Sequence, residues 1–131
     1  MRIVITLRIN TLIMKQIWLL PLFMLLFIGC GQVKQMPIEE FTKEDLKNAA
    51  LVDVRTPEEY LAGHMEDAIN IDWYDSDFIS KFSELPKNKS VYIYCKKGGR
   101  SAEAARVLDS IGYTVIDLLG GYDVLEAQNK N

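Results

Sequence analysis

Residues 91–101 read VYIYCKKGGRS, and this stretch decides the fold class. Residues 91–94 are β-branched or aromatic, which is typical of a buried strand. Two lysines and two glycines follow Cys95, and apolar residues then recur near one face of a helix, at positions 102, 105, 108 and 111. The stretch therefore predicts a strand, a short loop that begins with Cys95, and a helix.

Segments of strand and helix length alternate on both sides of this stretch. Further strands are expected at residues 38–41, 51–54, 68–71 and 114–118, and further helices at residues 42–49, from 57 onward, 75–85 and 122–128. Residues 56–59, TPEE, form a capping box with Pro at the first helical position. Such alternation predicts an α/β fold with a mainly parallel sheet covered on both faces. Ligands of such sheets bind beyond the carboxyl ends of the strands, where Cys95 stands.

The N-terminus has the pattern of a secretory signal. Lys15 precedes residues 17–28, IWLLPLFMLLFI, an uncharged run that is shorter than the about 20 residues needed to span a bilayer. Residues 26–30, LFIGC, resemble the lipobox of bacterial lipoproteins, with Phe27 in place of the usual Leu. The resemblance implies a signal peptide over 1–29 and a lipid on Cys30. A buried core helix is the alternative, but the run has no polar face.

Met14 opens a compact signal of its own, and we expect translation to start there. After the lipidated Cys30, residues up to 36 would form a polar tether and residues 37–131 a single domain. We therefore expect an extracytoplasmic protein, on the periplasmic or cell-surface side, that is anchored to the membrane by its lipid.

Removal of the first 29 residues changes both the charge and the thiol content. The remaining chain has 12 basic and 18 acidic residues, a net charge of −6, which makes nucleic acid an unexpected partner. If Cys30 carries lipid, Cys95 is the only free thiol, in a compartment where paired cysteines form disulfides. A lone thiol in that compartment suggests a chemical role.

The loop after Cys95 has the composition of an anion-binding site. Gly98 and Gly99 let the backbone curl so that amide N–H groups point inward. The helix that begins near Arg100 adds its positive end, and the lysines and Arg100 add charge. Such surroundings stabilise a thiolate over a thiol and suit a small sulfur oxyanion. The alternative is a cysteine that only packs in the core, as free cysteines often do.

Four sequence blocks resemble the rhodanese family, over residues 37–128. They read DVRTPEEY at 53–60, GHMEDAINI at 63–71, CKKGGRS at 95–101 and LGGY at 119–122. Two departures are Glu66-Asp67, where Pro-Gly is usual, and Tyr122, where Trp is frequent. The resemblance implies a three-layer sandwich with a sheet of about five strands. It also implies an enzyme without metal or organic cofactor, which we expect to be a monomer.

The resemblance further implies a thiosulfate sulfurtransferase. Cys95 would be the nucleophile and would carry a sulfur atom, as a persulfide, from a donor such as thiosulfate to a thiol, cyanide or protein acceptor. The implied substrate-binding residues are Lys96, Lys97, Gly98, Gly99, Arg100 and Ser101. Asp53 and Arg55 would brace the loop, although an ordinary ion pair is equally open. His64, the only histidine, falls in a structural turn of the family and is not expected to act as a base.

Three other functions are compatible with parts of the sequence. Related phosphatases and arsenate reductases place five residues between Cys and Arg, whereas four separate Cys95 from Arg100 here, which favours sulfur over phosphate. A thiol redox protein would need a second thiol to resolve oxidised Cys95. A non-catalytic binding module on the same fold is the third alternative, and the intact Cys95 and Arg100 argue against it.

Overall fold

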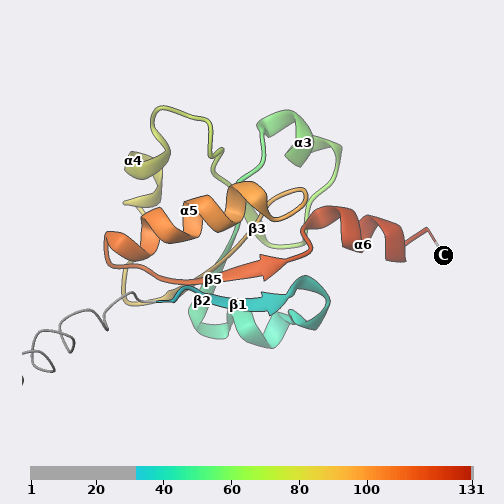
Figure 1. The fold of residues 1–131 in the computed structure, drawn as a ribbon, viewed down its shortest axis with the longest axis horizontal. Coiled ribbons are helices and arrows are strands. Elements are labelled where there is room, and N and C mark those ends of the chain that lie inside the picture. Colours follow the sequence, from blue (N-terminus) through green and yellow to red (C-terminus); the bar gives the residue numbers. More distant parts are fainter. Residues whose placement is uncertain (1–31, 131) are drawn as a thin grey trace, which may run out of the picture. The chain divides into compact units, whose positions relative to one another are not determined.

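A computed structural model of the protein describes residues 32–130, and the expected signal peptide and Cys30 lie outside them. The described chain forms a five-stranded sheet in the order β1-β5-β4-β2-β3, and every neighbouring pair is parallel (Figure 1). The strands are β1 Lys34–Pro37, β2 Ala49–Asp53, β3 Ala68–Asn70, β4 Ser90–Tyr94 and β5 Thr114–Leu119. The helices are α3 Pro57–Ala62, α4 Phe78–Phe82, α5 Gly99–Ser110 and α6 Tyr122–Gln128, with 3-10 turns η2 Ile38–Glu40 and η3 Lys43–Asn48. The expected α/β fold is confirmed.

Helical elements cover both faces of the sheet, which gives the expected three layers. One core contains Ile93 and Cys95 and packs against α4 and α5. The other contains Leu51 and Tyr94 and packs against η2, η3, α3 and α6. Figure 1 shows α5 and η3 on opposite sides of the sheet. Because side chains alternate along a strand, Cys95 faces α5 whereas Tyr94 faces away from it.

The strand expected at residues 38–41 is wrong. Ile38–Glu40 is the 3-10 turn η2. Its apolar residue, Ile38, reflects burial in the core that also contains Leu118, and not a strand. The strand lies earlier, at Lys34–Pro37, within the segment expected to be a tether. It is an edge strand paired only with β5 and largely exposed, so it lacks the apolar alternation that reveals a strand in sequence.

Helix lengths also differ from expectation. The helix expected at 75–85 shortens to Phe78–Phe82, because the Asp75 carboxylate accepts a hydrogen bond from the Asp77 N–H, at 3.1 Å, and forms a turn instead. The segment after Thr42 is a 3-10 helix, and the Thr42 N–H donates to the Asp45 carboxylate at 2.8 Å. Among residues 32–130, no helix has the length and apolar character that crossing a bilayer requires.

Candidate active site

Cys95 lies at the carboxyl end of β4, beneath the start of α5. The residue is 1% exposed, and its Sγ accepts a hydrogen bond from the Gly98 backbone N–H at 3.0 Å. Gly98 has φ 101°, a left-handed conformation that a glycine adopts without strain and that turns the chain directly into α5. The thiol therefore faces an amide N–H and the positive end of a helix twelve residues long.

The turn between Cys95 and α5 is held by Ser101. Its hydroxyl donates to the Gly98 carbonyl oxygen at 3.1 Å, and the Ala102 N–H donates to the same oxygen at 3.0 Å. Ser101 is fully buried, so its hydroxyl is fixed by these contacts and not by solvent. Gly98 thus has its carbonyl bound to α5 and its N–H directed at the sulfur.

The turn between β5 and α6 fixes the other side of the loop. The Tyr122 N–H donates to the Cys95 carbonyl oxygen at 2.9 Å, and the Asp123 N–H donates to the Lys96 carbonyl oxygen at 3.1 Å. Gly121 approaches the loop so closely that a Cβ there would lie 2.4 Å from the Lys96 oxygen. This contact explains why the LGGY block accompanies the active loop, a reason that the sequence did not reveal.

Arg100 forms an ion pair with Glu59, a partner that the sequence did not reveal. Its Nη1 and Nη2 donate to the two carboxylate oxygens of Glu59, at 2.7 and 2.8 Å. These hydrogen bonds are the main cause that lowers the pKa of Glu59 to about 2 and that raises the pKa of Arg100. The guanidinium also lies 5.6 Å from the ring centre of the exposed Tyr74. The positive charge of Arg100 is therefore compensated by the carboxylate of Glu59.

Glu59 is a site residue that sequence reasoning assigned only to the capping box. The same Oε2 atom that binds Arg100 also accepts the Thr56 N–H at 3.0 Å, so one carboxylate caps α3 and anchors α5. The spacing of the box located Glu59 but could not show that a residue 41 positions away would bind it. Tyr74 was missed for the same reason.

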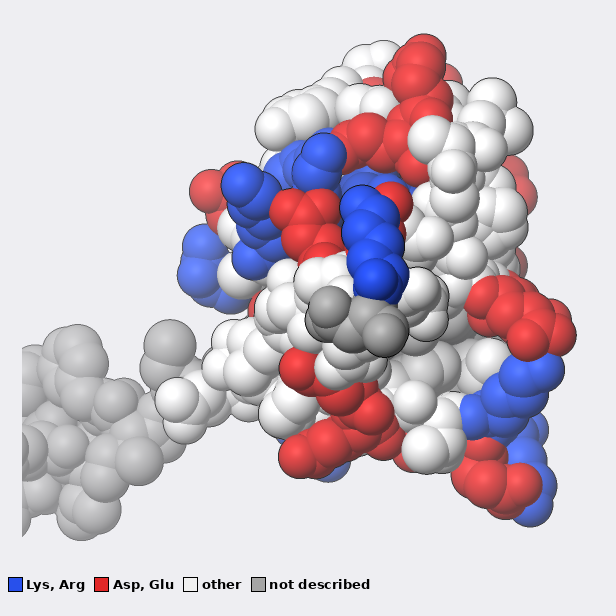
Figure 2. Space-filling view, turned by 90° about the vertical axis from the view of Figure 1, so that its right-hand side faces the viewer, with Lys and Arg blue, Asp and Glu red and all other residues white. Residues whose placement is uncertain are grey.

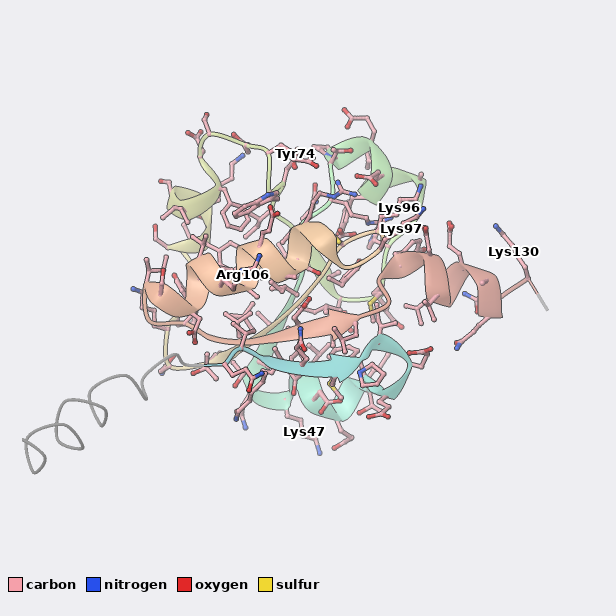
Figure 3. All side chains as sticks on the ribbon, in the orientation of Figure 1. Lys47, Tyr74, Lys96, Lys97, Arg106 and Lys130 are labelled. Carbon is pink, nitrogen blue, oxygen red and sulfur yellow. The ribbon has the colours of Figure 1, made fainter. Side chains whose placement is uncertain are left out.

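The two lysines of the loop are its exposed cations. Lys96 and Lys97 are exposed, and neither forms an ion pair within the part of the chain that the structure describes. Figure 3 shows both near the start of α6, consistent with the Asp123 contact. Figure 2 views the end of the molecule toward which β5 points, and positive and negative side chains are interspersed on it. Among the described residues, this face therefore has no broad positive surface, and the attraction of an anion depends on the lysines next to the loop.

Asp53 and Arg55 form a buried ion pair at the end of β2. The side chains are 0% and 4% exposed, and Arg55 Nη2 lies 2.6 Å from Asp53 Oδ2. Burial alone would lower the pKa of Arg55, but the hydrogen bonds and charge of Asp53 outweigh it and raise the pKa. Arg55 also donates to the Gly63 carbonyl oxygen at 2.6 Å.

This pair reaches the active loop through Tyr122. The Arg55 guanidinium carbon lies 4.2 Å from the centre of the Tyr122 ring, a cation–π distance. Tyr122 is the residue whose N–H holds the Cys95 carbonyl. The Asp53–Arg55 pair thus contacts the loop indirectly, through the residue that binds the Cys95 carbonyl.

His64 and three further aromatic residues make packing contacts. The His64 ring stacks on Tyr60 at 3.8 Å between centres, and its Nδ1 lies 2.9 Å from the Tyr60 carbonyl oxygen. Tyr94 is buried and its hydroxyl accepts the Met65 N–H at 3.1 Å. Trp73 and Tyr92 pack against the two cores.

Comparison with known proteins agrees with this geometry. Residues 39–128 match the model of the rhodanese-like domain. The chain is 38% identical to a sulfurtransferase of Allochromatium vinosum, over 59% of this chain and 71% of that one. It is 36% identical to the thiosulfate sulfurtransferase PspE of Escherichia coli, over 53% of this chain and 67% of that one.

Among solved structures, a rhodanese-related protein of Thermoplasma volcanium superposes with a TM-score of 0.64 and 27% identity. The match covers 72% of this chain and 92% of that one. Fold, loop and sequence thus agree, and the chain belongs to the family of rhodanese-like domains, in which its matched relatives include sulfurtransferases.

Proposed function

We propose that the protein moves a sulfane sulfur from a donor such as thiosulfate to an acceptor through a persulfide on Cys95. The observation that carries the proposal is the Gly98 N–H at 3.0 Å from Cys95 Sγ, under the first turn of α5. A nucleophilic cysteine must be ionised to react, and a helix N-terminus with inward amides favours the ionised form.

The chemistry balances without a cofactor. The Cys95 thiolate attacks the outer sulfur of thiosulfate, a new S–S bond forms, and the bond to the sulfonate sulfur breaks with its electron pair on departing sulfite. The enzyme then holds a persulfide with one negative charge. An acceptor thiolate or cyanide attacks the outer sulfur and returns the Cys95 thiolate.

The charges around the loop suit a dianionic donor. Glu59 neutralises much of the Arg100 charge, so Lys96 and Lys97 are the cations that attract the donor. Backbone amides of the loop would stabilise the persulfide that remains, as oxyanion holes stabilise developing charge. Arg100 then orients the start of α5 through its carboxylate partner and does not bind the donor directly.

Mass spectrometry of the intact domain after incubation with thiosulfate tests the proposal. A gain of one sulfur atom is expected, which cyanide then removes as thiocyanate. Cys95→Ser is the matched control and is expected to gain nothing. A wild-type protein that gains no sulfur but binds a partner would support the binding-module alternative, and turnover of a generic phosphate ester would support the phosphatase.

We further propose export as a lipoprotein, which rests on residues 15–30 of the sequence alone. The chain expressed in a bacterium and extracted from membranes is expected to begin at Cys30 and to carry a diacylglyceryl group in its intact mass. Recovery of Cys30→Ser with the same mass shift would contradict this proposal.

A further inference from the structure

Asp117, in the middle of β5, is a buried carboxyl without a well-formed hydrogen bond. The residue is 1% exposed, and neither carboxylate oxygen makes a hydrogen bond of good geometry within residues 32–130, although the Ser101 and Gln35 side chains lie close to it. The other fully buried acid, Asp53, is paired with Arg55. An ionised carboxylate without partners is strongly disfavoured in a protein interior, so Asp117 is expected to be uncharged.

The position of Asp117 places it under the active loop. Its neighbour in β4 is Ile93, and Cys95 follows Ile93 by two residues. Val115, two residues before Asp117, packs in the core that also contains Cys95. Because side chains two residues apart share a face, the carboxyl and the thiol lie on the same face of neighbouring strands, under the start of α5.

The polar groups that face Asp117 come from two elements. Burial is the main cause that raises its pKa, and the polar groups nearest the carboxyl are the Ser101 hydroxyl, the Gln35 side chain and Arg106. Ser101 and Arg106 belong to α5, Gln35 to β1, and β4 presents the apolar Ile93. Arg106 is exposed on α5, where Figure 3 labels it, so water screens its charge.

The single hydroxyl hydrogen of Ser101 links Asp117 to the loop. Ser101 has one hydroxyl hydrogen, which it donates to the Gly98 carbonyl oxygen, so toward Asp117 it can only accept. An uncharged carboxyl can donate to Ser101 Oγ and leave that contact intact. An ionised carboxylate could accept a hydrogen bond from Ser101 only by taking that hydrogen away from Gly98.

We propose that Asp117 is a positioning residue of the active loop, which in its uncharged form donates to Ser101 and thereby holds Gly98 with its N–H on the Cys95 sulfur. Ionisation of Asp117 would release this arrangement and place a negative charge on the face of the sheet that carries the Cys95 sulfur. The reactivity of Cys95 therefore depends on the protonation of Asp117. The importance of this dependence for sulfur transfer rests on the proposed function. The experiment itself measures only the reactivity of the Cys95 thiol, so it does not depend on that function.

The test is the rate of Cys95 alkylation by iodoacetamide, followed by intact mass from about pH 5 to about pH 9, a range across which a buried carboxyl can ionise. Asp117→Asn keeps an uncharged donor and is the matched control. The ratio of wild-type to Asn-variant rates is expected to be near one at the acid end and to fall as the pH rises. A ratio that stays constant across the range would overturn the proposal.

Asp117→Leu removes the donor without leaving a buried charge, so it is expected to fold. Its alkylation rate is expected to be lower by about threefold to tenfold at neutral pH, as for the loss of one hydrogen bond. Wild-type reactivity of this variant would overturn the proposal.

Ser101→Ala is the second variant, because it interrupts the link without changing β5. It is expected to lower the rate by itself, and adding Asp117→Leu is expected to cause little further loss. Additive losses would show that Asp117 does not act through Ser101. Sulfur loading from thiosulfate is measured separately, so a protein that fails to load sulfur yet shows the pH-dependent ratio refutes the proposed function alone.

Discussion

Replacing Gly121 by alanine is expected to lower the rate of sulfur loading on Cys95 by about 100-fold or more, the size of effect seen when a reacting group is misplaced by about 1 Å. The new Cβ would lie 2.4 Å from the Lys96 carbonyl oxygen and 2.7 Å from the Lys97 nitrogen. Both atoms belong to backbone, so the loop itself must move. The contact that holds the Cys95 carbonyl on Tyr122 would then be lost.

Gly112→Ala is the matched control for this prediction. Gly112 also has a positive φ, 94° against 70° at Gly121, but a Cβ there meets nothing within 4 Å. Both substitutions place a side chain at a positive φ, but Gly121 also has ψ −177°, a backbone region almost restricted to glycine, so strain there adds to the clash with the loop. Only Gly121→Ala should lose sulfur loading, measured by intact mass below the melting temperature. Equal activity of the two variants would show that the loop tolerates displacement.

Replacing Arg55 by methionine is expected to reduce the free energy of unfolding by about 3–5 kcal/mol, measured by urea denaturation. The change leaves Asp53, which is fully buried, without its cationic partner, and an uncompensated buried charge is the usual cause of losses of this size. The Tyr122 ring also loses the guanidinium packed against it.

The double variant Asp53→Leu with Arg55→Met serves as the control. Replacing a buried ion pair by apolar residues is often neutral or stabilising, so the double variant is expected to recover most of the lost stability. A single variant that loses less than about 1 kcal/mol would mean that Asp53 finds another partner or is uncharged.

The sequence predicted those elements whose signals are local. The capping box at Thr56, the strand before Cys95 and the helix after Gly98 were all found where expected. Each depends on contacts within a few residues or on burial on both faces, and such causes leave a pattern in the sequence. The position of Cys95 at the end of a parallel strand followed from these elements alone.

The remaining features depend on contacts between distant segments. β1 is exposed and paired on one side, so its residues carry no strand pattern. Glu59 and Arg100 are 41 positions apart, and only the fold shows that they neutralise each other. The unpaired state of Asp117 likewise follows from its burial between β1, β4 and α5, which no spacing in the sequence indicates.

The active loop is held by hydrogen bonds from the start of α6, so it is not expected to keep its geometry outside this fold. A synthetic peptide of residues 95–101 would contain Cys95 and the loop amides, yet nothing would bind the carbonyls of Cys95 and Lys96 that α6 binds here. Transplanting the proposed sulfur transfer onto another parallel sheet would therefore require two grafts, the loop and the segment 119–123, at a fixed spacing.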